Sequence, residues 1–381
     1  MAAPLCAQSN DPAIESYYAA NALYNKNLYQ LAVDEYKAFI AKYPKHEKNL
    51  HARFGLALSL YEMKRFQEAE PLFGALARER DAPRKEKVYN LWGQCLLMLG
   101  KPAQAEDAFL WSVNRGKERL FLDLPGMGGD YQEAPELSTT AVQDADPLEI
   151  SLVGLVEALF QQRKWQGVID YALEFVKIVP KGQYMPRVLF QQAFAHYELQ
   201  QYPAATEVLE NIKLYHKNTP FYEHAVFLLA ECQRETGQLD VAARNHEIVA
   251  REIKGDFASN ALFRLAFIRF SQKQYDRAAA DFEDLRLLYP SSEYFNESGI
   301  YLGRSHLERD DYAKAQAVFG DLTNVAPVAS EATLWLAKTF LRQSNYKQAL
   351  DVLRPALRKF ATDPNAVHFI FEYGVSLMGV E

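Results

Sequence analysis

The sequence predicts an all-α protein, a right-handed α-α solenoid (superhelix) of about nine helix hairpins followed by one C-terminal helix. Three observations support this fold class. A self-similar segment recurs about every 37 residues, apolar residues recur at helical spacing on both sides of a short turn in each copy, and the repeated features are packing residues rather than charges. Units of this length are single helix hairpins, which bury a continuous core only by stacking on their neighbours.

The repeated segment is seventeen residues long and ends in proline. Its second residue is aromatic, its fifth is small or aliphatic and its twelfth is apolar. Four copies show this most clearly: LYQLAVDEYKAFIAKYP at 28–44, KWQGVIDYALEFVKIVP at 164–180, QYDRAAADFEDLRLLYP at 274–290 and DYAKAQAVFGDLTNVAP at 311–327. The charged residues between these places vary from copy to copy. We therefore interpret them as a solvated face and not as a catalytic cluster.

The fifth residue marks the second helix of each predicted hairpin. Its nine copies are Ala32, Ala69, Ala105, Val168, Ala205, Ala242, Ala278, Ala315 and Ala349, at spacings of 37, 36, 63, 37, 37, 36, 37 and 34. Twelve residues earlier, where the paired helices should cross, stand Ala20, Ala57, Gly93, Val156, Ala193, Ala230, Ala266, Gly303 and Ala337. A small residue at a crossing lets two helix backbones approach closely, so the pattern predicts tightly packed antiparallel pairs. Val156 is the one exception, and its pair is expected to be slightly splayed.

The order of elements along the chain follows from this register. The single long spacing predicts an irregular insertion, because its glycines, prolines and acidic residues break helical periodicity. The first residues, with LCA before Gln8, are similar to the end of an export signal. The predicted segments are 1–12, disordered or a signal-peptide remnant; 13–113, three repeats; 114–147, the insertion or linker; 148–364, six repeats; and 365–381, a capping helix or the start of a further repeat.

Composition excludes several classes of function. The net charge is -7 and no basic block occurs, so a nucleic-acid partner is not expected. No apolar run approaches the roughly 20 residues that span a bilayer, so no membrane span is predicted. Cys6, Cys95 and Cys232 are odd in number and far apart, which fits buried or idle thiols better than disulfides or a zinc site.

The recurring small, aromatic, alanine, aromatic and proline places resemble those of the tetratricopeptide repeat family over residues 13–364, apart from the insertion. The endings KYP, LYP and VAP are similar to repeats of bacterial envelope proteins, among them outer-membrane assembly lipoproteins and the coordinator of the Tol-Pal system. The resemblance implies a concave groove lined by the first helices, and a protein or peptide partner. It also implies a periplasmic or outer-membrane-associated protein that takes part in an envelope complex, with the cytoplasm as the alternative location.

Helical spacing from the crossing residue predicts which side chains line this groove. With the crossing residue as place 8 of a unit, they stand at places 5, 9, 12 and 13, where aromatic residues are frequent. Rings of this kind suit an extended peptide or a helix, whereas the alternative is that they pack between neighbouring first helices. The predicted partner-binding residues are Tyr17, Tyr24, Phe54, Tyr61, Phe190, Phe194, Tyr197, Phe227, Phe263, Phe267, Phe270, Arg304 and Lys338.

Basic residues in the groove admit two interpretations. Some members of the resembled family hold a C-terminal carboxylate with a lysine and asparagine clamp, but here Asn21 is accompanied by Tyr17 where lysine belongs. That mode is therefore not expected. A looser basic strip remains, which either pairs with an acidic partner or is a solvated face: Arg234, Arg304, Lys338 and Arg342.

No catalytic, cofactor or metal site is predicted. His196 and His306 occupy one packing place of the repeat, and His46 and His51 are five apart rather than the four that put two ligands on one helix face. The leading hypothesis is a non-catalytic interaction scaffold of the cell envelope that binds a partner peptide or helix in the groove. The alternative is a structural assembly protein that self-associates through its ends or supports polysaccharide or envelope export.

Overall fold

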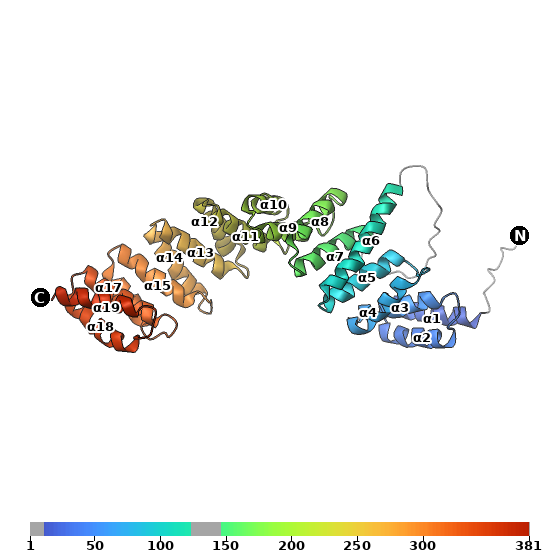
Figure 1. Cartoon of the computed structure of the whole chain (residues 1–381), viewed down its shortest axis with the longest axis horizontal. Helices are drawn as coiled ribbons and strands as arrows, with labels where there is room; N and C mark the ends of the chain where they lie inside the picture. The colour runs from blue at the N-terminus through green and yellow to red at the C-terminus, as the bar shows by residue number, and fades with distance from the viewer. Residues whose placement is uncertain (1–10, 123–145, 381) are drawn as a thin grey trace. The chain divides into compact units, whose positions relative to one another are not determined.

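The computed structural model describes residues 11–122 and 146–380, and all regular structure in these ranges is helical. The fold class is the α-α superhelix that the repeat predicts. The chain divides into two compact units, residues 1–200 and 201–381, each a series of antiparallel helices (Figure 1). No helix in the described ranges is long and apolar enough to cross a membrane.

The described residues of the first unit form nine α-helices. They are α1 (Pro12–Asn25), α2 (Tyr29–Lys42), α3 (Asn49–Glu62), α4 (Phe66–Arg78), α5 (Lys85–Met98), α6 (Pro102–Leu122), α7 (Pro147–Gln161), α8 (Trp165–Ile178) and α9 (Met185–Glu198). The second unit continues with α10 (Tyr202–Tyr215), α11 (Tyr222–Glu235), α12 (Leu239–Glu247), the π-helix η1 (Ile248–Ile253), α13 (Ala258–Ser271), α14 (Tyr275–Leu288), α15 (Phe295–Glu308), α16 (Tyr312–Leu322), α17 (Ala329–Arg342), α18 (Tyr346–Lys359) and α19 (Ala366–Met378).

The turn before each second helix has one shared backbone geometry. The residue that the repeat marks as aromatic or apolar opens every second helix, and the residue two places before it has a left-handed φ. Only two of these nine turn residues are glycine, the residue that adopts this conformation without strain. They are Asn27, Lys64, Gly100, Arg163, Gln200, Gly237, Lys273, Asp310 and Ser344.

The predicted crossing residues are buried, and two of the glycines lie against a ring of their own hairpin. A Cβ atom on Gly303 would lie 2.6 Å from the Phe319 ring, and one on Gly93 would lie 2.7 Å from the Phe109 ring. Both rings are fully buried. Each of these two hairpins is therefore closed by an aromatic ring of the second helix that packs on a glycine of the first helix.

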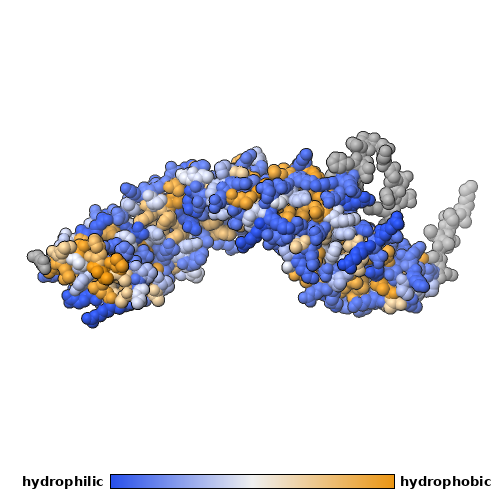
Figure 2. All heavy atoms as spheres, in the orientation of Figure 1, coloured by the Kyte–Doolittle hydropathy of each residue, from blue (hydrophilic) through white to orange (hydrophobic). Residues whose placement is uncertain are grey.

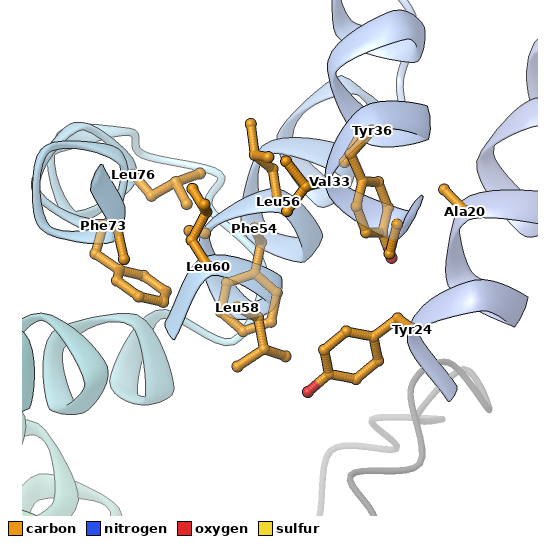
Figure 3. Close-up of a cluster of buried hydrophobic side chains, with 14 of the residues drawn as sticks. Ala20, Tyr24, Val33, Tyr36, Phe54, Leu56, Leu58, Leu60, Phe73 and Leu76 are labelled. Atoms are coloured by element: carbon orange, nitrogen blue, oxygen red, sulfur yellow. The ribbon is translucent and has the colours of Figure 1, made fainter. Parts of the chain in front are cut away.

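The core of the first unit continues from one hairpin to the next. Figure 3 shows Tyr24, Tyr36, Phe54 and Phe73 from α1 to α4 converging in one buried cluster. The Tyr36 hydroxyl donates a hydrogen bond to Oδ1 of Asn21 at 2.5 Å, so the buried polar group of α1 is satisfied from α2. Apolar contacts therefore continue from one hairpin to the next, while this hydrogen bond joins the two helices of the first hairpin.

The helices on either side of the predicted insertion pack directly on one another. Asn90 of α5 donates to the carbonyl of Pro147 at 3.0 Å and accepts from the Ser151 hydroxyl at 2.7 Å, while Ser112 of α6 lies 2.8 Å from Ser151.

Helix α6 extends to Leu122, so residues predicted to begin the insertion at 114 are helical instead. The rest of the insertion, 123–145, lies outside the described residues, as do residues 1–10 and Cys6. The two compact units divide after residue 200.

The second unit buries a charged cluster between α11, α12 and α13. Glu231 lies 3.1 Å from His246 Nε2, 3.1 Å from Arg234 Nη2 and 3.7 Å from Arg264 Nε. His246, Arg264 and Arg234 lower the pKa of Glu231, although burial opposes them. Burial of the imidazole lowers the pKa of His246, and this outweighs the attraction of Glu231.

Among the described residues, none covers one apolar face of α19. Phe369 is fully buried against α17 and α18, yet Phe371 is 66% exposed, whereas Leu334 at the same place in α17 is 5% exposed. Figure 2 shows apolar residues gathered over α17–α19. The open α19 face comprises Val367, Ile370, Phe371, Leu377 and Met378.

We expect Gly303→Ala to destabilise the protein and Gly320→Ala to stabilise it. The new methyl group at position 303 would overlap the Phe319 ring, and overpacking of a core costs about 1–3 kcal/mol. No atom lies within 4 Å of a Cβ on Gly320, where alanine should gain up to about 1 kcal/mol from helix propensity. Urea denaturation would measure both, and equal shifts of the same sign would contradict close packing at the crossing.

Acidification should destabilise the second unit through His246. Its folded pKa is lowered below 6.5, so stability is present above that pH and decreases as the unfolded state takes up a proton below it. The lowered pKa of Glu231 adds a loss only as pH falls below 4.5. Between pH 7.5 and 5.5 the Tm of the wild type should therefore fall more than the Tm of His246→Gln. Each kcal/mol of unfolding free energy lost by protonation lowers Tm by about 2–4 °C. Parallel curves would rule out this role for the imidazole.

Candidate functional site

Four of the predicted groove residues belong to the core. Tyr17, Tyr24, Phe54 and Phe263 are at most 4% exposed. Three of these rings pack on a second-helix ring of their own hairpin: Tyr17 on Phe39 at 5.9 Å, Phe54 on Phe73 at 6.3 Å and Phe263 on Phe282 at 6.0 Å between centroids. A partner could reach them only by unpacking a hairpin, so their contribution is to stability.

Four predicted residues of the first unit are half-buried: Tyr61, Phe190, Phe194 and Tyr197. Phe194 lies 5.3 Å from Phe160 and 5.8 Å from Trp165, which places rings of α7, α8 and α9 in one cluster. The Tyr61 hydroxyl donates to Gln94, and its burial raises its pKa to about 12. These rings keep some accessible edge but are engaged by neighbouring helices.

The remaining predicted residues belong to the second unit and lie on α11, α13, α15 and α17. Phe227 is half-buried against Phe257, at 5.0 Å. Phe267 is 38% exposed, while Phe270, Arg304 and Lys338 are half-buried. The aromatic stretch from 190 to 270 in the sequence is therefore shared between two separately described units, and its accessible part in the second unit centres on α13.

Arg304 brings three first helices together. Its guanidinium carbon lies 5.0 Å from the ring centroid of Phe270 on α13, 5.0 Å from Tyr301 on α15 and 4.6 Å from Trp335 on α17. The Phe267 ring meets Tyr301 edge to face at 5.2 Å. Cation–π contacts of this kind stabilise a partly desolvated guanidinium by about 0.5–2 kcal/mol each.

The same surface continues onto α17. Lys338 Nζ lies 4.7 Å from the centroid of Trp335 and 3.7 Å from a carboxylate oxygen of Glu372 on α19. Trp335 donates its indole N–H to Glu331 at 3.3 Å, which fixes the ring orientation. We call the set Phe267, Phe270, Tyr301, Arg304, Trp335 and Lys338 the α13–α17 strip.

Sequence reasoning missed two members of this strip. Tyr301 and Trp335 stand two residues before the crossing places Gly303 and Ala337, a position not assigned to the groove. A signal was present for Tyr301, because residues three apart on a helix share a face and Arg304 follows it at that spacing. The same spacing separates Trp335 from Lys338, but the contact of Trp335 with Arg304 comes from packing of α17 on α15, which spacing within one helix does not reveal.

The structure also shows the surroundings of the asparagine considered for a carboxylate clamp and of the residues of the predicted basic strip. Asn21 is buried and accepts the hydrogen bond from Tyr36, so it faces the core. Arg234 pairs with Glu231 and Glu235, and Arg342 pairs with Glu308 at 3.1 Å. Arg304 and Lys338 are thus the two members of the predicted basic strip that stack on rings.

Two histidines and two cysteines that lie outside the strip are buried or lie close to a carboxylate. His46 lies 3.2 Å from Asp11, and the buried His306 lies 3.6 Å from Glu283. Burial raises the pKa of Cys95 and of Cys232 to about 12, which leaves both thiols unreactive at neutral pH. Within 11–122 and 146–380, no three His, Cys, Asp or Glu residues gather so that they could hold a metal ion.

Comparison with solved structures finds repeat proteins of the same fold. The C-terminal part of a TPR repeat-containing protein from Cytophaga hutchinsonii matches with a TM-score of 0.54 and 14% identity, over 74% of this chain and 98% of that one. The apo form of RapI matches with a TM-score of 0.50 and 14% identity, over 93% of this chain and 99% of that one. Identities this low show the fold alone. No curated protein sequence matches the chain.

Two family models described as tetratricopeptide repeat match the sequence. One matches residues 17–83, 54–111 and 302–364, and the other matches 260–292. The matched ranges together cover about half of the chain and fall on both compact units. With the hairpins, the crossing residues and the structural neighbours, they show that the chain belongs to the tetratricopeptide repeat family.

Proposed function

We propose that the protein is a non-catalytic interaction scaffold that binds a peptide segment of a partner protein on the α13–α17 strip. The family is one of protein-binding repeats, which present an extended surface on stacked helices. The observation that carries the proposal is the exposed Phe267 ring, continuous with Tyr301, Arg304 and Trp335 on consecutive first helices.

The dimensions of the strip suit a short peptide. Packed helices lie about 8–10 Å apart, so three successive first helices span about 20 Å. An extended chain covers that distance in about six residues. Aromatic rings and arginine are the side chains most often found at the centre of binding surfaces, since they bury a large area with little loss of side-chain entropy.

The cellular location stays part of the proposal. The endings KYP at 42–44, LYP at 288–290 and VAP at 325–327 support a place in the bacterial envelope, because they are similar to repeats of envelope proteins. Fractionation of the native host and protease accessibility of the periplasm would test this. Recovery of the protein with the cytoplasmic fraction would overturn the envelope location without touching the binding mode.

Phe267→Ala should weaken partner binding by at least about tenfold, which corresponds to 1.4 kcal/mol. A photo-crosslinking amino acid placed at 267 would first identify the partner in the native host, and titration of the purified pair would then give Kd. Leu287→Ala is the matched control, since Leu287 is a 77% exposed apolar residue on the second helix α14. Its Kd should stay within about twofold of the wild type. Equal Kd values for both variants would refute binding on the strip.

A second candidate function, self-association, is favoured by the open α19 face. This face consists of uncharged residues, so its complement must be apolar, and a second copy of the chain supplies an identical face through a two-fold axis. We commit to that occupant, with α19 packing against α19 of another copy. Such a contact is compatible with peptide binding on the strip, because it uses different residues.

Phe371→Glu should convert such a dimer into a monomer, because a carboxylate buried between two apolar faces is strongly destabilising. Light scattering across a concentration series of about 1–100 µM would measure the change in mass. Leu214→Glu, at a 69% exposed position on α10, controls for added surface charge. A wild type that is monomeric throughout, or a dimer that survives Phe371→Glu, would exclude this contact.

A further inference from the structure

We propose that Arg304 is the receptor for a single carboxylate of the peptide that binds the α13–α17 strip. The inference rests on the proposed function and names the chemistry of the partner. The ligand is an acidic peptide with one carboxylate at this position. We do not expect a peptide with several consecutive acidic residues to bind this surface as well.

The first reason is the charge balance around Arg304. Neighbouring arginines are paired, with Arg309 2.6 Å from Asp276, Arg269 2.6 Å from Asp281 and Arg342 3.1 Å from Glu308. Arg304 forms no ion pair within 4.0 Å among the residues that the structure describes. A half-buried guanidinium without a carboxylate has a stronger interaction to offer an incoming anion than one already neutralised.

The second reason is that the side chain is held in place before any ligand arrives. Phe270, Tyr301 and Trp335 lie within 5.0 Å of its guanidinium carbon, on three different helices. Stacking on rings leaves N–H groups at the edge of the guanidinium plane, and these match the two oxygens of a carboxylate. Because little side-chain entropy is left to lose, a hydrogen bond here contributes more to affinity.

The third reason is the arrangement of charge along the helices. Glu297 stands seven residues before Arg304 on α15, which is about 10 Å along the axis, and Glu331 stands seven residues before Lys338 on α17. Burial and then Glu331 raise the pKa of Glu297, so the two acids are close enough to repel each other. The surface is therefore basic at the middle of these helices and acidic at their starts. A second carboxylate over the starts would be repelled.

Lys338 has a lesser part in this recognition. It occupies the place in α17 that Arg304 occupies in α15, but its ammonium already lies 3.7 Å from Glu372. Its charge adds to the attraction at longer range, while the directional hydrogen bonds come from Arg304. The carboxylate belongs to an Asp or Glu side chain or to a chain terminus, since both present the same two oxygens.

Synthetic peptide arrays would test the assignment and separate these sources. Random eight-residue peptides anchored through their C-termini offer only side-chain carboxylates, and peptides anchored through their N-termini also offer the terminal one. Each array is probed with the wild type, Arg304→Gln, Arg304→Lys and Phe267→Ala. Arg354→Gln, an exposed arginine on the second helix α18, is the matched control. Circular dichroism would verify that every variant is folded.

The wild type should select peptides with one Asp or Glu, or with a free C-terminus, in preference to their Asn, Gln or amide counterparts and to peptides with three or more acids. Arg304→Gln should lose at least tenfold in affinity for the selected peptides, Arg304→Lys should lose less, and Arg354→Gln should stay within twofold. Selected peptides that need Phe267 but show no preference for an acid would overturn the role of Arg304 and leave the proposed function standing. Binding of no peptide by the folded wild type would overturn both.

Discussion

The structure depends on close contact between the two helices of a hairpin, which is tightest where a glycine of the first helix receives a ring of the second. At Gly303 and Gly93 the space for even one methyl group is already filled, by Phe319 and Phe109. A hairpin closed in this way is still too small to be stable alone, so its outer faces are covered by the next hairpin. A buried polar group is also satisfied within its hairpin, because Tyr36 of α2 donates a hydrogen bond to Asn21 of α1. Within the second unit, repetition of the hairpin brings neighbouring first helices into contact, and these helices carry the strip.

Within that frame, small differences in burial separate core from surface. Phe263 and Phe267 are four residues apart on α13, yet one is packed against Phe282 and the other is exposed. Arg304 shows how a charged side chain is accommodated between the buried core and the exposed surface. It is held by rings of three helices, whereas Glu231 at the equivalent place of α11 is held by His246 and two arginines. The equivalent place in successive units therefore carries an exposed ring, a cation or a neutralised carboxylate, and this variation gives a repeat surface its specificity.

On the open face of α19, apolar residues are exposed at places that are buried in another first helix. Phe371 corresponds to Leu334 of α17, which is buried in one cluster with residues of α18 and with Phe369 of α19. Nothing in their chemistry differs from that of other core residues; only the covering helix does. An apolar side chain is thus core or contact surface depending on its neighbours, and the same holds for the rings of the strip.

The repeat register by itself determined the fold class, the places of the second helices and the crossing residues, because packing at fixed spacing leaves a periodic trace. It also placed Phe267, Arg304 and Lys338 on first helices. It could not tell that Tyr17, Tyr24, Phe54 and Phe263 are core, because burial depends on the helix opposite. The left-handed turn residues left no trace, since only two of the nine are glycine. Tertiary structure alone brought Trp335 and Phe270 onto Arg304, because those contacts join residues more than thirty positions apart through the stacking of separate hairpins.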